Sequence, residues 1–340
     1  MHAPPDATAE ALLAMKHIAF GPEPGPESLR LIEGEVPVAG AGELLIAVDH
    51  AGVNRPDVQQ RAGKYPPPPG ASPILGLEVS GTIAAVGVGV TGWRVGESVC
   101  ALAPGGGYAE FCVVPVGQAL PVPKGFTLEQ AAGLCETWFT VWANLVDIGR
   151  VAAGQTVLIH GGSSGIGLAA IDLVKLRGAR SIVTVGDDEK ARFCREFGAF
   201  AAINYRNEDF VARARELTDG EGVDVVLDMV GGDYVPRNVS VLRRDGRLVL
   251  IALQRGASAE LDLNAVMRKR LTITGSTMRP RTIAEKTAIR DALRREVWPA
   301  FEDGRVRVHV HATFPLAQAA EAHRLMESGR HVGKILLRVR

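Results

Sequence analysis

Residues 157–172 read VLIHGGSSGIGLAAID. A short apolar run leads into a cluster of glycines, and the cluster leads into a helical pattern. A glycine-rich turn lets the backbone approach a phosphate, and the N–H groups and positive dipole end of the following helix favour an anion. The stretch therefore predicts a dinucleotide pyrophosphate site on Gly161, Gly162, Gly165 and Gly167; a tight turn without a ligand is the alternative.

The chain around this loop alternates between strand-like and helix-like segments from about 155 to 275. The expected strands are 155–160, 181–186, 201–205, 223–230, 246–252 and 271–276. The expected helices are 168–178, 188–198, 208–220 and 234–246. This alternation predicts βαβ units and a doubly wound parallel sheet with helices on both faces.

The flanking parts of the chain have a different pattern. Short β-like runs separated by glycine and proline predict a small all-β unit, with strands near 16–20, 43–53, 76–87, 97–102 and 108–115. One helix is expected over 127–149, in which Trp138 and Trp142 are core residues rather than a ligand platform. A charged helix is expected over 282–304, and a strand over 333–339 is expected to return to the first block.

These patterns predict three parts of the chain. Residues 1–14 form an N-terminal extension. A discontinuous β-rich domain takes residues 15–137 and 277–340, and the Rossmann coenzyme domain, residues 138–276, is inserted in it. A length of 340 residues fits two domains.

Composition excludes several classes of function. There are 38 basic and 38 acidic residues, a balance that argues against nucleic acid or a membrane surface as the main partner. No stretch has the roughly 18 apolar residues of a membrane span, and the first residues do not resemble a signal peptide. The four cysteines, Cys100, Cys112, Cys135 and Cys194, form no CxxC pair, so reduced thiols in a cytoplasmic protein are expected.

The tip of the second strand predicts the choice of coenzyme. Gly186 stands where NAD enzymes usually carry an acidic residue, and it leaves room for a 2′-phosphate. Lys190 and Tyr205-Arg206 could converge on that phosphate, so NADPH is favoured over NADH. Asp187 is discordant, because a carboxylate repels phosphate, unless Asp187 or Asp188 caps the next helix. If NADH were preferred, Asp187 would instead hold the ribose hydroxyls.

Five motifs along the chain are specific in combination: HGGSSGIGLAAI, TVGDDEKARF, AINYRNEDF, DMVGG and GVNRPDVQQRAGKYPPPPGASPILGLEVSG. Through these motifs the chain resembles the zinc-independent quinone oxidoreductases of the medium-chain dehydrogenase/reductase superfamily, which include ζ-crystallin. The run KYPPPPGASPILGLE with PGGGYAEF most resembles the p53-inducible branch. The resemblance covers about 15–340 and implies a GroES-like catalytic domain, NADPH as coenzyme, and a homodimer or higher homo-oligomer.

The resemblance also implies site residues. Asn54 and Tyr65 match polar residues that line the substrate cleft between the domains, and they are the candidate catalytic residues. The candidate coenzyme-binding residues are Thr140, Ser164, Gly165, Ile166, Gly167, Gly186, Lys190, Tyr205, Val230, Leu253, Ser276, Met278, Gly333 and Lys334. Gly329 departs from the pattern, since some relatives place a phosphate-binding arginine there; Arg330 is adjacent.

The zinc enzymes of the superfamily differ at one stretch. Gly76-Leu77-Glu78 has leucine where they carry a histidine ligand, and no cysteine lies near Asn54, so no zinc is expected. Without a Lewis acid, alcohol deprotonation is difficult, whereas an electron-poor quinone or similar small electrophile accepts hydride readily. The prediction is an NADPH:quinone oxidoreductase. Reduction of an enone C=C bond and a non-catalytic NADPH-binding protein remain the alternatives.

Overall fold

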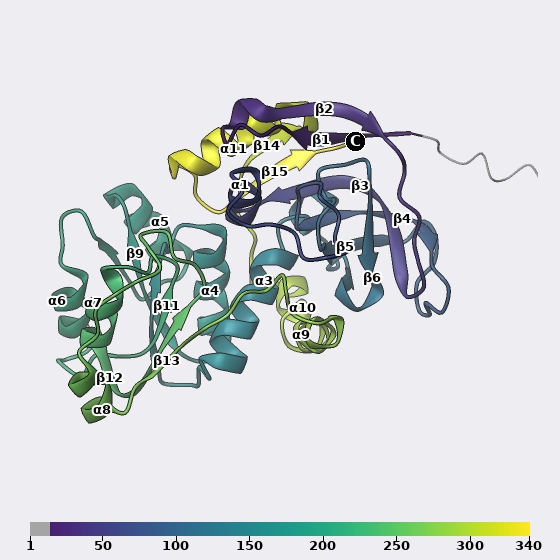
Figure 1. The fold of residues 1–340 in the computed structure, drawn as a ribbon. Coiled ribbons are helices and arrows are strands. Elements are labelled where there is room, and N and C mark those ends of the chain that lie inside the picture. Colours follow the sequence, from purple (N-terminus) through teal and green to yellow (C-terminus); the bar gives the residue numbers. More distant parts are fainter. Residues whose placement is uncertain (1–13) are drawn as a thin grey trace, which may run out of the picture.

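The computed structural model describes residues 14–340 (Figure 1). The predicted extension lies outside the described residues, except for Ala14. Two sheets occupy the two halves of the molecule, and the helix α3 (Cys135–Val141) lies between them in Figure 1. The predicted boundary between residues 137 and 138 therefore falls inside a helix, and the division into domains stays a prediction.

The first sheet has seven strands in the order β14-β15-β3-β4-β5-β7, with β6 paired to β3. Its strands are β3 (Glu43–Val53), β4 (Glu78–Val86), β5 (Ser98–Leu102), β6 (Phe111–Pro115), β7 (Ala119–Pro121), β14 (Val310–Pro315) and β15 (Lys334–Arg338). Strand β15 pairs antiparallel with β3, which confirms the predicted return of the last strand. A separate ribbon joins β1 (Met15–Phe20) to β2 (Leu29–Gly34). The helical elements on this side are α1 (Arg55–Arg61), α11 (Ala319–Ser328), and the 3₁₀ turns η1 (Pro26–Ser28), η2 (Val116–Gln118) and η4 (Leu316–Gln318).

The second sheet has six strands in the order β10-β9-β8-β11-β12-β13, and all its pairings within the described residues are parallel. The strands are β8 (Thr156–His160), β9 (Arg180–Val185), β10 (Ala201–Asn204), β11 (Val223–Asp228), β12 (Leu242–Leu250) and β13 (Thr272–Gly275). The helices are α4 (Gly165–Leu176), α5 (Asp188–Phe197), α6 (Phe210–Glu216), α7 (Tyr234–Val241) and α8 (Leu263–Lys269). This arrangement confirms the predicted α/β fold.

The prediction of one continuous helix over 127–149 is wrong. The chain forms α2 (Leu128–Ala131), then α3, then the π-helix η3 (Trp142–Ile148). Gly133 lies at the break, where a residue without a side chain weakens helix continuation. The helix expected over 282–304 is likewise divided into α9 (Ile283–Glu296) and α10 (Trp298–Glu302), because Pro299 cannot donate the backbone bond that would join them.

The helix predicted over 234–246 extends too far at its C-terminal end. Helix α7 stops at Val241, and residues 242–250 belong to β12. The register with β11 shifts there, so that Val223 pairs with Leu242 but Val225 pairs with Arg247. Residues 243–246 form the resulting bulge, and the Asp245-Gly246 pair is a turn signal.

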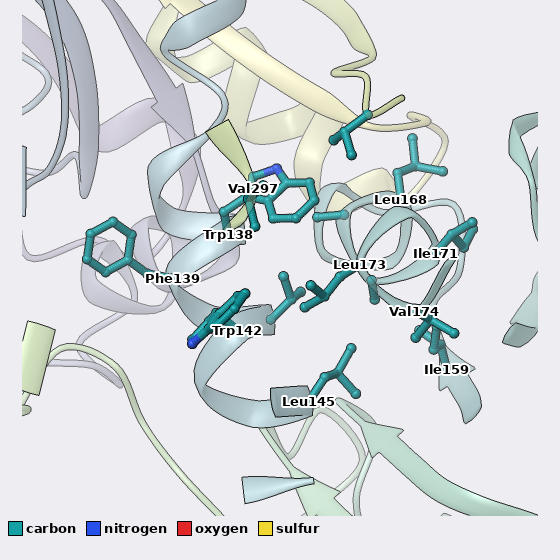
Figure 2. Packing of buried hydrophobic residues seen from close by; sticks show 14 of the residues in the cluster. Trp138, Phe139, Trp142, Leu145, Ile159, Leu168, Ile171, Leu173, Val174 and Val297 are labelled. Atoms are coloured by element: carbon teal, nitrogen blue, oxygen red, sulfur yellow. The ribbon is translucent and has the colours of Figure 1, made fainter. Parts of the chain in front are cut away.

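The largest hydrophobic cluster packs α3 and η3 against α4, the helix that follows the glycine loop (Figure 2). Trp138 and Trp142 are 2% and 4% exposed, which confirms that both are core residues. They pack with Leu173 and other residues of α4 and with Ile159 of β8. Burying aromatic and aliphatic surface at about 25 cal/mol per Å² holds α3 rigidly beside the start of α4.

Candidate functional site

The glycine loop has the geometry of an anion cradle. Ser164 caps α4: its Oγ accepts from the Gly167 N–H at 3.0 Å and donates to the Gly161 carbonyl at 2.7 Å. A Cβ on Gly167 would lie 2.3 Å from the Gly162 carbonyl oxygen, so only glycine permits this approach. The first-turn N–H groups of Gly165 and Ile166 have no intrahelical acceptor, and they are suited to a phosphate.

Thr140 contributes an unsatisfied group beside this helix. Its Oγ1 is buried and has no hydrogen-bond partner within residues 14–340. Asn144 Nδ2 donates to the Thr140 carbonyl at 2.9 Å, and Ser276 Oγ donates to Asn144 Oδ1 at 2.9 Å. The structure thus brings Thr140 and Ser276 together through Asn144, a residue that sequence reasoning missed. A buried hydroxyl without a partner fits a polar ligand.

The predicted adenosine-phosphate residues lie at the tip of β9. A Cβ on Gly186 would lie 3.0 Å from Tyr205 Oη and 3.8 Å from Arg206 Nε, so these three residues are neighbours. Asp187 caps α5, where its Oδ1 accepts from the Lys190 N–H at 2.8 Å, and this confirms the capping role. Lys190 Nζ donates to the carbonyl of Gly329 at the end of α11.

Two further predicted residues meet at the carboxyl ends of β11 and β12. Val230 donates its N–H to Asp228 Oδ1 at 2.6 Å and accepts from the Arg255 N–H at 2.8 Å. Leu253 is 49% exposed, and its Cδ2 lies 2.9 Å from the position of a Cβ on Gly231. Met278 packs separately, at the margin of the largest hydrophobic cluster. All three stay predictions as ligand contacts.

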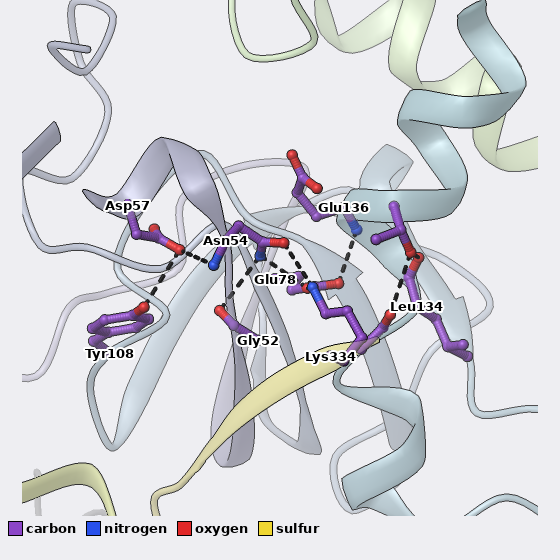
Figure 3. Close-up of polar contacts among 10 residues, drawn as sticks. Gly52, Asn54, Asp57, Glu78, Tyr108, Leu134, Glu136 and Lys334 are labelled. Atoms are coloured by element: carbon purple, nitrogen blue, oxygen red, sulfur yellow. Dashed lines mark hydrogen bonds and ion pairs between the residues drawn. The ribbon is translucent and has the colours of Figure 1, made fainter. Parts of the chain in front are cut away.

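Asn54 is held in a buried ionic cluster (Figure 3). Lys334 Nζ lies 2.6 Å from both Asn54 Oδ1 and Glu78 Oε1, and Asn54 Nδ2 donates to the same Glu78 oxygen at 2.9 Å. The Lys334 and Glu78 side chains are 5% and 0% exposed. The second Asn54 amide hydrogen has only a 3.5 Å contact with the Gly52 carbonyl. The carboxamide therefore has a fixed orientation with one donor position weakly used.

Sequence reasoning missed this cluster. Glu78 was considered only in relation to zinc, although it is a lone carboxylate in an apolar strand, and such a residue needs a partner when buried. Lys334 lies 256 positions away in sequence. Its contact with the coenzyme stays a prediction, and its ammonium contacts Glu78 of β4.

Two more buried carboxyl groups belong to residues that contact this cluster, Asp57 and Glu136. Asp57 accepts from the Asn54 N–H at 2.8 Å and the Gly76 N–H at 2.9 Å, and burial raises the pKa of Asp57 to about 6. The Glu136 N–H donates to Glu78 Oε2 at 2.9 Å. Burial raises the pKa of Glu136 to about 7, and Lys334 opposes this rise. Burial therefore makes both carboxyl groups hold their protons to a higher pH than exposed carboxyl groups do.

Tyr65 lies at the edge of the same cluster. The guanidinium of Arg279 lies 5.7 Å from the centre of its ring. Burial, and secondly the charge of Glu136, raise the pKa of the Tyr65 hydroxyl. Arg279 itself is anchored, because it donates to Gln60 Oε1 at 2.8 Å and to the Pro104 carbonyl at 2.9 Å. No hydrogen bond joins Tyr65 to Asn54 in the described part of the chain.

The potential metal ligands are dispersed. Across residues 14–340, no three His, Cys, Asp or Glu side chains are arranged to hold a metal ion. Leu77 is buried, and the four cysteines are free and buried. In the same part of the chain, every helix is too short or too polar to cross a membrane.

Comparison with known proteins shows which families the chain resembles. Residues 40–124 match the family model "Alcohol dehydrogenase GroES-like domain", and residues 197–337 match "Zinc-binding dehydrogenase". The chain is 32% identical over 301 residues to a mycocerosic acid synthase-like polyketide synthase of Mycobacterium tuberculosis, a match that covers 88% of this chain and 14% of the synthase. The chain therefore spans about one seventh of the length of that relative.

Other relatives match over their full length. A quinone oxidoreductase of Pseudomonas aeruginosa is 32% identical over 324 residues, which cover 95% of this chain and 99% of that protein. The structure of Escherichia coli quinone oxidoreductase complexed with NADPH superposes with a TM-score of 0.81 at 30% identity, and covers 96% of this chain and 99% of that one.

Proposed function

Because the chain belongs to the medium-chain dehydrogenase/reductase superfamily of oxidoreductases, we propose that it is a zinc-independent NADPH:quinone oxidoreductase. One observation carries the proposal. Ser164 forms a bridge with Gly333, whose N–H donates to the Ser163 carbonyl at 2.8 Å. The next residue, Lys334, holds Asn54. The anion cradle and the proposed acceptor site are thus joined by two consecutive residues.

The residues around the loop fit NADPH. Gly165, Ile166 and the capped Gly167 turn would hold the pyrophosphate, and the free Thr140 hydroxyl would gain a partner. Gly186, Tyr205 and Lys190 would surround the 2′-phosphate. When bound, NADPH supplies a hydride at its nicotinamide ring. The similarity to a protein solved with NADPH supports this choice.

Within this proposal the protein positions the acceptor rather than protonating it. A quinone that gains hydride becomes a stabilised phenolate, which water can protonate. Asn54 would offer its weakly used amide hydrogen to the acceptor oxygen, and Tyr65 would pack against the acceptor ring. Leu77 and the dispersed cysteines support a reaction that needs no zinc. We also propose a cytoplasmic location and a homodimer or higher oligomer that pairs through β13, an edge strand of the parallel sheet.

Asn54→Ala is expected to lower kcat/KM for quinone reduction by about ten- to a hundredfold, which corresponds to about 1.4–2.7 kcal/mol of transition-state positioning. NADPH affinity, measured by fluorescence titration, should change little. The control is Asn264→Ala on the exposed face of α8, which should leave both quantities unchanged.

A panel of candidate substrates tests which class of reaction the protein catalyses. Steady-state NADPH oxidation is measured with quinones, enones, aldehydes and alcohols. Turnover confined to aldehydes or alcohols would refute the proposal. Enones reduced faster than any quinone would assign the enone alternative, and tight NADPH binding without any turnover would indicate a non-catalytic protein.

Lys190→Ala is expected to weaken NADPH binding by about tenfold or more, since a charge-assisted contact with a phosphate is worth about 1.5–3 kcal/mol. NADH affinity should remain nearly unchanged. Lys175→Ala, an exposed substitution on α4, is the control. Equal losses for NADPH and NADH would show that Lys190 acts only through its bond to Gly329.

A further inference from the structure

A cavity of about 220 Å³ lies at the edge of the parallel sheet opposite the glycine loop. It is formed where β8, β11 and β12 begin, whereas the loop of residues 161–164 follows the end of β8. At about 3.3 Å per residue, the length of β8 separates the two places by roughly 17 Å. The cavity is therefore distinct from the proposed coenzyme site. Four arginines line it: Arg150, Arg243, Arg244 and Arg247.

Two carboxylates, those of Asp224 and Asp245, also line the cavity, and each pairs with an arginine. Asp224 pairs with Arg243 at 3.3 Å and accepts from the Thr156 N–H at 2.8 Å. Asp245 pairs with Arg270 at 2.6 Å. Each of the two carboxylates thus has its ion pair with an arginine other than Arg150, Arg244 and Arg247, although the charge of Arg244 also acts on Asp245.

The other three arginines have no such partner. Within residues 14–340, the side chains of Arg150, Arg244 and Arg247 make no ion pair and no hydrogen bond, although all three face one cavity. Cations that share a small space repel one another, and the repulsion is removed when an anion binds between them. Guanidinium groups present paired N–H donors that match the oxygens of phosphate.

The backbone is also unusual at this place. Arg150 and Asp245 have φ values of 54° and 63°, a region that residues with a side chain rarely adopt. The bulge of residues 243–246 turns this part of β12 out of the regular ladder. Such conformations concentrate at ligand sites, where the surrounding structure maintains them.

We propose that this cavity binds a small, multiply charged oxyanion of the phosphate class. Its volume corresponds to about seven waters at roughly 30 Å³ each, enough for phosphate or pyrophosphate. Pockets for larger organic ligands begin near about 300 Å³, so the space suits a small anion better than a whole nucleotide. The site is a second anion site on the molecule, separate from the glycine loop.

The test is calorimetric titration with inorganic pyrophosphate at constant ionic strength, with the protein saturated with NADPH so that the loop is blocked. Parallel titrations use orthophosphate and glycerol 3-phosphate, which distinguish a free anion from a phosphate monoester. The triple variant Arg150→Gln/Arg244→Gln/Arg247→Gln should bind the tightest of these probes at least about tenfold more weakly than the wild type.

A second triple variant controls for the loss of three positive charges. Arg30→Gln/Arg94→Gln/Arg294→Gln removes exposed arginines elsewhere and should keep wild-type affinity. If both variants bind the anion equally weakly, the loss of affinity comes from the change in net charge, and the proposed site is refuted. Binding that the first triple variant retains, or no binding of any probe to the wild type, would also refute it. NADPH affinity equal to wild type shows that the variant is folded.

Discussion

Lys334→Met is expected to lower the free energy of unfolding by about 3–5 kcal/mol, because removing one partner of a buried ion pair leaves the other charge uncompensated. Glu78 is 0% exposed, and Lys334 is the cation 2.6 Å from its Oε1. The remaining donors to Glu78 are the neutral amide of Asn54 and one backbone N–H. Urea unfolding at neutral pH measures the change.

The double variant Lys334→Met/Glu78→Gln tests the cause. It contains no buried charge at this pair, so it should recover more than half of the lost free energy. Lys175→Met, at an exposed position of α4, is the matched control and should change stability by no more than about 0.5 kcal/mol. A single variant as stable as the wild type, or a double variant less stable than the single, would show that the ion pair does not stabilise the fold.

Glu136→Gln is expected to stabilise the protein increasingly as the pH rises from about 4.5 to about 7. Burial raises the pKa of Glu136 from 4.5 to about 7, so in this range the folded chain retains a proton that the unfolded chain has lost. Stability from this group is present below the unfolded pKa and is lost as pH rises through the folded pKa. The loss amounts to about 3 kcal/mol, at about 1.4 kcal/mol per tenfold change in proton affinity.

The measurement is the difference in unfolding free energy between the variant and the wild type at pH 4.5 and pH 8. Asp57 and Lys334 face Glu136 in both proteins, so their own contributions largely cancel in the difference. Glu221→Gln, an exposed substitution, should give the same small difference at both pH values. An equally flat result for Glu136→Gln would mean that its carboxyl remains solvated.

The fold could be predicted because its signals are local. The strand over 43–53 and the strand–glycine–helix sequence at 157–172 are recognisable from their periodicity and turn residues, and both form as expected. The errors occur where tertiary packing overrides a local pattern. The helix over 127–149 is interrupted at Gly133 and changes to a π-helix at Trp142. The end of α7 gives way to a bulged strand because β11 offers a pairing edge.

The candidate site was only partly accessible from the sequence. Ser164 and Gly167 follow from a motif, and Asp187 from the preference of aspartate for helix caps. The ion pair between Glu78 and Lys334 has no such signal, because its residues come from β4 and β15, which lie on either side of β3 only after the first sheet closes. Sequence reasoning assigned Lys334 to the coenzyme, which stays a prediction, and did not foresee that its ammonium contacts Asn54.

The position of β15 between β14 and β3 in the first sheet has a consequence for synthesis of the chain. Residues 50–53 of β3 pair with residues 335–338, so that edge of β3 stays open until nearly 300 further residues have been translated. The parallel sheet draws every strand from residues 156–275 and is complete well before that point. We therefore expect the parallel sheet to form first on the ribosome and the first sheet to close late, so that the open edge of β3 is the part of the nascent chain most in need of a chaperone.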